Sequence, residues 1–255
     1  MKRIGAIAGI TFKEAKRDRI LYLLFFFAAL GIVASRVLAI LTVGDRVKII
    51  KDVGLASIAV FGVLMAILIG TGLVYKEIDK KTIFTLLAKP LHRAEFILGK
   101  FLGLVLTLFV MTAAMTVIFL AIVYAHTLQV EGRLLVAVAY IFLELVLITA
   151  VAILFSSFST PILSSLFALA FYLIGHLSWG LELIIKKMAP GTGRTLVRIL
   201  YLVLPDLENF NFKTEVVHGL PIPPGIYVSS VLYGVCYTAF ILGLAVLVFR
   251  RRDFV

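Results

Sequence analysis

Residues 134–155, LLVAVAYIFLELVLITAVAILF, decide the fold class of this chain. The stretch is 22 residues long and holds one charged side chain, Glu144. As an α-helix it would measure about 33 Å, enough to cross a hydrocarbon core of roughly 30 Å. Its apolar residues do not alternate with polar ones, which argues against a strand of a transmembrane barrel. The stretch therefore predicts a membrane-spanning helix.

Five further stretches have the same character, namely 20–43, 54–75, 101–125, 161–180 and 226–249. The six together hold only two of the 39 charged residues, Arg36 and Glu144. The chain is 62% hydrophobic and 15% charged, whereas soluble proteins are about 25% charged. This composition excludes soluble enzymes, nucleic-acid-binding domains and disordered chains. We expect an all-α integral membrane protein with six transmembrane helices in one domain over residues 1–255.

The basic residues predict an orientation. With six spans both termini share a side, which comprises residues 1–19, 76–100, 156–160 and 250–255. This side has 15 Lys and Arg in 55 residues, and the other side has nine in 63. Because basic residues accumulate on the cytoplasmic side, we expect both termini in the cytoplasm. Topology and contact with anionic lipid headgroups account for the net charge of +11, so we expect no nucleic-acid partner.

The segment before the first span has apolar residues at helical spacing. These are Ile4, Ile7, Ala8, Thr11 and Ala15, and basic residues that include Lys13 and Arg17 crowd the end nearest the membrane. The pattern predicts a helix lying in the interface with its apolar face toward lipid. The alternative is a basic flank that only sets the topology.

The loop between the second and third spans has the pattern of a short amphipathic helix. Asp79 is a good N-cap and Pro90 cannot continue a helix, so we expect a helix over 80–89. Its apolar face would carry Ile83, Phe84, Leu86 and Leu87, and its polar face Lys80, Lys81 and Lys89. From Arg93 to Lys100 a second helix would continue into the third span. This arrangement suits transmission of force to a soluble partner, and it equally suits a connector that covers the end of the bundle.

Two ionisable residues within the predicted spans, Glu144 and His176, are candidates for a function. Glu144 lies near the middle of the bilayer, where a carboxyl group is costly and often functional. Counting along antiparallel helices places the Tyr172 hydroxyl at its depth, so we expect Glu144 to hydrogen-bond a partner such as Tyr172. This pair would be a structural clamp or part of a transport pathway. For His176, near the other end of its span, the alternatives are a proton or metal role and a hydrogen-bonded interfacial histidine.

Small residues and a long loop complete the pattern. Gly62, Gly70, Gly72, Gly99 and Gly103 mark positions where helices can approach closely. Within residues 181–225 the apolar runs 181–188 and 196–204 are too short to span a membrane. The segment would be a cap, a gate or a docking surface for an extracytoplasmic partner.

Motifs around these spans resemble the permease subunits of ABC-2 type ATP-binding-cassette exporters. The strongest similarity lies in the loop, at Lys76-Glu77, Thr82, Leu86-Leu87-Ala88, Pro90-Leu91, Arg93 and Gly99-Lys100. Further similarity lies in Thr11-Phe12-x-Glu14-Ala15-x-Arg17-Asp18, in Pro205-Asp206-Leu207-Glu208-Asn209-Phe210-Asn211 and in Phe249-Arg250-Arg251-Arg252-Asp253-Phe254. The chain is most similar to the branch that includes permeases of copper-enzyme maturation, such as nitrous-oxide reductase assembly.

The resemblance implies roles for two segments. Residues 4–18 would be an elbow helix along the inner leaflet, with Ile4, Ile7, Thr11, Lys13 and Arg17 on it. Residues 80–90 would be a coupling helix seated in a groove of a separate ATPase. The coupling residues would be Asp79, Lys80, Lys81, Thr82, Ile83, Phe84, Leu86, Leu87, Lys89, Pro90 and Arg93. The working unit would contain two permeases, expected as a homodimer, and two ATPases, in the inner membrane of a bacterial cell.

No cofactor is expected on this chain, because ATP and Mg²⁺ would bind the ATPase. The nearest approach to a phosphate-binding loop is APGTGRT at 189–195, which has Met188 where the first glycine should stand and Arg194 where the lysine should stand. The chain is therefore expected to transport and not to catalyse. Two competing functions are a proton-coupled secondary transporter using Glu144 and a non-transporting membrane anchor of an enzyme-maturation complex. The second would tolerate changes in residues 80–90.

Overall fold

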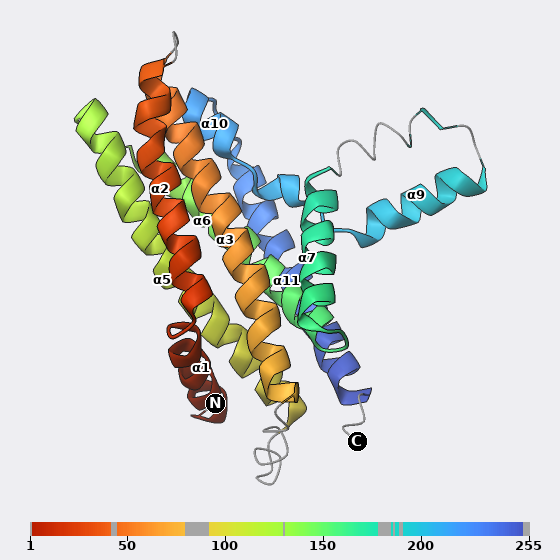
Figure 1. Cartoon of the computed structure of the whole chain (residues 1–255). Helices are drawn as coiled ribbons and strands as arrows, with labels where there is room; N and C mark the ends of the chain where they lie inside the picture. Colours follow the sequence, from red (N-terminus) through yellow and green to blue (C-terminus); the bar gives the residue numbers. More distant parts are fainter. Residues whose placement is uncertain are drawn as a thin grey trace.

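The computed structural model describes residues 2–41, 45–79, 92–129, 131–177, 185, 187–188 and 191–251 (Figure 1). Five described helices are long and apolar enough to cross a membrane. They are α2 (Arg19–Leu41), α3 (Arg46–Asp79), α5 (Arg93–Thr127), α6 (Gly132–Ser156) and α11 (Pro224–Arg251). A shorter apolar helix, α7 (Pro161–His176), stands at the position of the predicted fifth span. The prediction of an all-α multi-span membrane protein is confirmed.

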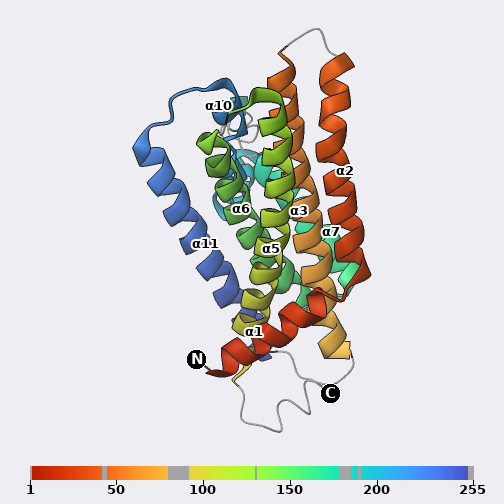
Figure 2. The ribbon, with the colours of Figure 1, turned by 90° about the vertical axis from the view of Figure 1, so that its left-hand side faces the viewer.

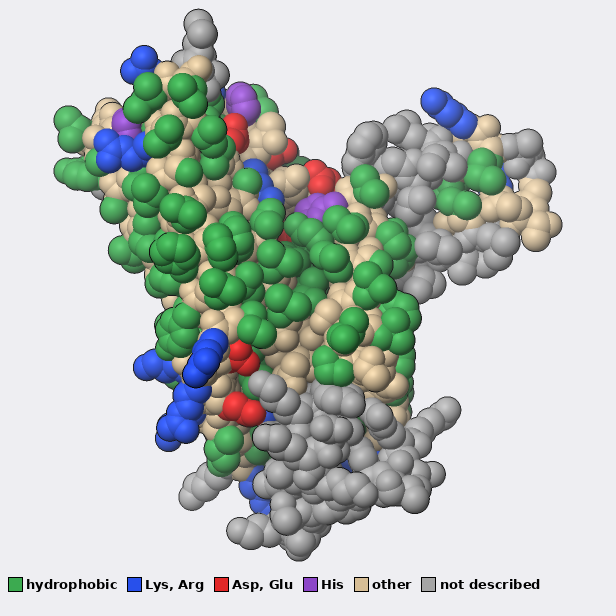
Figure 3. All heavy atoms as spheres, in the orientation of Figure 1, with side chains coloured by type: hydrophobic (Ala, Val, Ile, Leu, Met, Phe, Trp, Pro, Cys, Tyr) green, Lys and Arg blue, Asp and Glu red, His purple; other side chains and the backbone are tan. Residues whose placement is uncertain are grey.

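Helices α3 and α6 form the centre of the bundle. In each, 67% of the most apolar stretch is buried inside the protein, against 22% in α2, 33% in α5 and 28% in α11. Glycines bring the two central helices together, since a Cβ on Gly62 would lie 2.7 Å from Leu145 Cδ1 and one on Gly70 would lie 3.1 Å from Ala152 Cβ. Gly72, predicted to serve the same purpose, meets no neighbouring helix within 4 Å among the described residues. The outer helices turn apolar side chains outward over the middle of the bundle (Figure 3).

The bundle has two distinct ends (Figures 1 and 2). Both chain termini, the end of α3 and the start of α5 lie at one of them, which we name the α1 end. The end of α2, the start of α3 and the short helix α10 (Lys213–His218) lie at the other, the α10 end. Helix α1 (Lys2–Ala15) crosses the foot of the bundle obliquely (Figure 2). The predicted elbow segment is helical. The two termini lie at the same end, as an even number of spans predicts.

The second span begins earlier than predicted. Residues 46–53, expected in a loop, form the first two turns of α3. Lys51 is buried in this extension, and its Nζ lies 2.6 Å from Glu131 Oε1 at the start of α6. An ion pair offsets much of the cost of burying the ammonium, which allows basic residues to belong to a packed helix.

Helix α7 is shorter than the predicted 161–180 span. It has 16 residues, about 24 Å of helix, and residues 178–180 lie outside the described part of the chain. Beyond its end the 3₁₀ turn η1 (Leu207–Phe210) packs against α7 and α6 with Leu207 and Phe210 buried. Gly175 makes this contact possible, because a Cβ there would lie 2.7 Å from Leu207 Cγ and 3.1 Å from the Pro205 carbonyl oxygen.

Within the described residues of this loop, helix α9 (Thr192–Val203) matches the predicted apolar run at 196–204. It stands away from the bundle (Figures 1 and 3). Most of the other predicted run, 181–188, lies outside the described residues.

Candidate functional site

The first turn of α5 is fastened to the last turn of α11. Glu95 accepts a hydrogen bond from the His92 backbone N–H at 3.2 Å, which fixes the start of α5. Arg93 Nη1 then donates to the carbonyl oxygens of Phe249 and Arg250, each at 2.9 Å. Carbonyls in the last turn of a helix lack intrahelical partners, so this guanidinium caps α11. The Phe96 and Phe249 rings stack beside it with centroids 5.6 Å apart.

Helix α1 is seated on α5 two turns further along. A Cβ on Gly99 would lie 2.6 Å from Ile7 Cβ, and one on Gly103 would lie 2.6 Å from the Ala8 carbonyl oxygen. Between the two glycines Lys100 is buried, and its Nζ lies 3.4 Å from Glu14 Oε2. These small residues allow the two backbones to come into contact.

The apolar face of α1 points elsewhere than predicted. Thr11 and Ala15 are fully buried and Ile4 and Ile7 are half-buried, because this face covers the glycines of α5 and not lipid. Lys13 and Arg17 are exposed on the other side, where Ile10 is 61% exposed. Sequence periodicity detects an apolar face and does not say whether lipid or protein covers it.

The predicted coupling residues fall into three groups. Asp79, expected to cap a new helix, is the last residue of α3. Lys80, Lys81, Thr82, Ile83, Phe84, Leu86, Leu87, Lys89 and Pro90 lie outside the described residues. Arg93 lies in α5, which runs without a break from 93 into the third span as predicted, and its guanidinium caps α11.

A group of polar side chains lies between α6 and the end of α7, where Glu144 is 1% exposed. The carboxylate contacts His176 and not the expected Tyr172, since Glu144 Oε1 lies 2.8 Å from His176 Nε2. Tyr172 packs edge-on against the imidazole with ring centroids 4.7 Å apart. Helical side chains lean toward the N-terminus of their helix, so on antiparallel helices Glu144 and His176 lean toward each other. Counting Cα positions alone therefore chose a residue one turn too early.

His176 also contacts a carboxylate that the sequence analysis did not assign to any site. Its Nδ1 lies 3.3 Å from Glu208 Oε2, and the other oxygen of Glu208 accepts a hydrogen bond of 2.7 Å from Asn211 Nδ2. Asp206 caps the same turn by accepting from the Glu208 backbone N–H at 3.2 Å. Glu208 lies in the 205–211 motif, so the motif was the available signal.

The three side chains form a polar chain from the interior to the surface. The side chain of Glu144 is 1% exposed, that of His176 21% and that of Glu208 43%. A neutral imidazole donates one hydrogen bond, whereas an imidazolium donates from both nitrogens and matches two carboxylates. The arrangement can therefore hold or pass a proton between Glu144 and the α10 end, or serve as a buried clamp.

Comparison with known families identifies the chain. A family described as ABC-2 family transporter protein matches residues 6–254. The chain belongs to the ABC-2 transporter family. A search of curated proteins finds no match to it. Membership of the ABC-2 family makes the chain a multi-pass permease subunit of an ABC transporter, which is a transport component.

Motifs of this ABC-2 permease that are distant in sequence meet in space. Glu14 of the N-terminal motif contacts Lys100 of the loop motif. Arg93 of the loop motif contacts Phe249 and Arg250 of the C-terminal motif. The 205–211 motif instead contacts His176 at the opposite end. Three motifs therefore converge on the start of α5, and the fourth serves the buried polar chain.

Proposed function

We propose that this permease exports its substrate using ATP hydrolysed by a separate ATPase, which binds residues 80–90. The segment and both termini would face the cytoplasm of a bacterial cell, whose inner membrane the chain crosses. Two copies would form a homodimer that carries two ATPases, and ATP with Mg²⁺ would bind only to those. Closure of the ATPases would push the segment and drive alternating access at the dimer interface.

The attachment of α5 carries this proposal. The helix begins at Arg93, three residues after the 80–90 segment ends, and within its first 11 residues it is bound to α11 through Arg93 and to α1 through Gly99 and Gly103. A displacement at the start of α5 would therefore move three helices together. A connector that merely covered the bundle would not require this attachment.

The direct test is ATPase stimulation in proteoliposomes that contain the permease and its co-expressed ATPase. Leu87→Asp places a charge on the predicted docking face and should abolish both co-purification and stimulation. Leu128→Asp is the matched control, because Leu128 is 76% exposed at the α10 end and its left-handed backbone tolerates aspartate. Equal behaviour of the two variants would contradict the proposal and favour a non-transporting membrane anchor.

Orientation is tested by cysteine labelling. With the exposed Cys236 replaced by serine, single cysteines at Lys89 and Thr195 are offered to a membrane-impermeant maleimide on intact cells. Only the cysteine at 195 should react before the cells are opened. Reaction at 89 alone would reverse the proposed topology.

The polar chain Glu144–His176–Glu208 favours a second candidate, proton-coupled secondary transport with Glu144 as carrier. It predicts transport in ATP-depleted vesicles under a proton gradient, and loss of that transport in Glu144→Gln. ATP-driven transport is expected to continue in the same variant if Glu144 is a clamp.

A further inference from the structure

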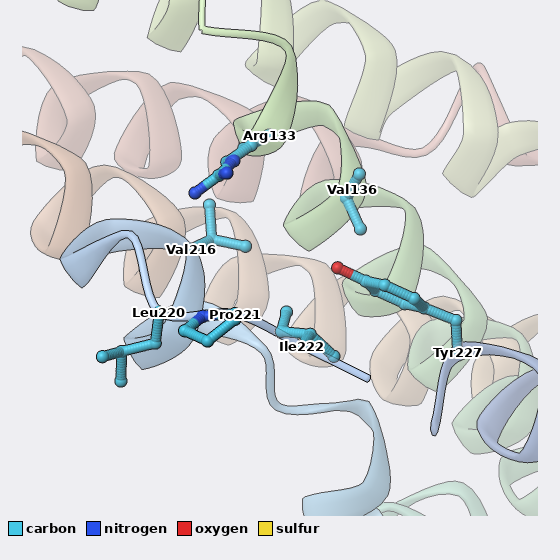
Figure 4. A pocket seen from close by; sticks show the side chains of 7 residues that line it. All are labelled: Arg133, Val136, Val216, Leu220, Pro221, Ile222 and Tyr227. Atoms are coloured by element: carbon cyan, nitrogen blue, oxygen red, sulfur yellow. The ribbon is translucent and has the colours of Figure 1, made fainter. Parts of the chain in front are cut away.

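A hollow at the α10 end lies outside both groups of residues described above (Figure 4). It has a volume of about 290 Å³. Its lining consists of Arg133, Val136, Val216, Leu220, Pro221, Ile222 and Tyr227. The walls come from α6, from α10, from the segment after it and from α11, so the fold and not one flexible loop shapes the hollow.

Two hydrogen-bond donors converge on this hollow. Arg133 reaches in from α6, and the hydroxyl of Tyr227 points in from the opposite side (Figure 4). Arg133 Nη1 lies 3.4 Å from the Gly219 carbonyl oxygen, a weak contact that uses one of five N–H donors. The remaining guanidinium donors and the phenol suit a phosphate or carboxylate group.

An apolar groove adjoins the hollow and shares Tyr227 as a wall. The groove has a volume of about 430 Å³ and is lined by Tyr140, Tyr227, Val228, Val231, Leu232 and Val235. The Tyr140 hydroxyl donates to the Tyr227 carbonyl oxygen at 2.9 Å, which fixes the wall between the two spaces. Val228, Val231, Leu232 and Val235 are all exposed along α11.

The two spaces together have the chemistry of one amphipathic ligand. From Tyr227 to Val235 the groove follows eight residues of helix, about 12 Å, toward the middle of the membrane. One leaflet of a hydrocarbon core is roughly 15 Å deep, so the groove lies within a single leaflet. The Arg133 guanidinium lies at the surface end of the groove, and apolar side chains line the groove toward the middle of the membrane.

We propose that the hollow and the groove form a binding site for an anionic phospholipid, with its phosphodiester at Arg133 and Tyr227 and an acyl chain along Val228–Val235. A spanning helix of a second copy would be longer than the groove, which measures about 12 Å. The site depends on the membrane-spanning fold and not on the proposed transport direction.

The test uses the full-length chain, delipidated in mild detergent, with bound lipid counted by native mass spectrometry. Phosphatidylglycerol should bind more tightly than phosphatidylcholine. Arg133→Gln should weaken phosphatidylglycerol binding about tenfold, the loss expected for a charge-assisted hydrogen bond. Arg36→Gln is the matched control, since Arg36 is exposed on α2 toward the same end and lines neither space. Equal effects of the two arginine variants would overturn the site.

A second arm separates a lipid from a free anion and from another copy of the chain. Val228→Trp and Val231→Trp should fill the groove and reduce lipid binding, because both valines are exposed and have room for the larger ring. Glycerol phosphate should bind weakly to all variants. If it binds as tightly as phosphatidylglycerol and ignores the tryptophans, the hollow is a phosphate site and the lipid assignment is wrong. If the tryptophans dissociate a dimer without loss of lipid, the groove is an interface between copies and the proposal also fails.

Discussion

The two ends of this permease are held together by different physical means. At the α1 end, glycines let α1 contact α5 and an arginine caps a helix through its backbone carbonyls. At the α10 end, titratable side chains form a chain from the buried Glu144 to the exposed Glu208. Close packing resists small displacements and moves as a unit, whereas a chain of ionisable groups responds to its occupancy by protons. The first arrangement suits transmission of force and the second suits response to the surroundings.

The largest expected effect on stability comes from removing the contact between Glu144 and His176. His176→Leu leaves Glu144 buried without its partner and should lower the free energy of unfolding by about 3–5 kcal/mol, the range for breaking a buried pair. Urea or thermal unfolding in detergent measures the loss. The double variant Glu144→Leu, His176→Leu removes both groups and should recover much of the stability. A double variant as unstable as the single one would show that Glu144 is not the source of the cost.

Gly103→Ala tests the packing at the α1 end. The added Cβ would lie 2.6 Å from the Ala8 carbonyl oxygen, so α1 must move, and we expect a loss of about 1–3 kcal/mol. Unfolding measurements and reduced crosslinking between cysteines on α1 and α5 check this expectation. Gly72→Ala is the control, because in the described part of the chain no packed neighbour lies within 4 Å of its added Cβ. Equal stability of both variants would show that α1 is not seated through Gly103.

Arg93→Gln should have the smallest effect. It removes the guanidinium from the carbonyl oxygens of Phe249 and Arg250 and should cost about 1 kcal/mol, since one of the two contacts is exposed. Hydrogen exchange should accelerate in the last turn of α11 while the centre of α6 stays protected. If exchange at both places is unchanged, Arg93 does not hold the helix end.

The long apolar runs were sufficient to predict the bundle, because a lipid environment leaves few alternatives to a helix of that length. Lys51 shows why boundaries were harder, since its burial in α3 depends on Glu131 far along the chain. Predicting the partner of Glu144 would have required knowing how side chains lean on two packed helices. Predicting the contact of Glu208 would have required knowing that its turn folds back beside Gly175. Arg133 carried no sequence signal, because the hollow beside it is built from four separate segments.

The shortness of α7 has a consequence for the surrounding bilayer. Its exposed flank includes Ile162, Leu166 and Leu173, yet its 16 residues measure about 24 Å, whereas α5 has 35 residues. A hydrocarbon layer of roughly 30 Å that meets a shorter apolar wall thins locally. The membrane beside α7 is therefore expected to be compressed, which draws headgroups and water toward the depth of His176. The bilayer would be thinner beside α7, and lipids with short chains would gather there.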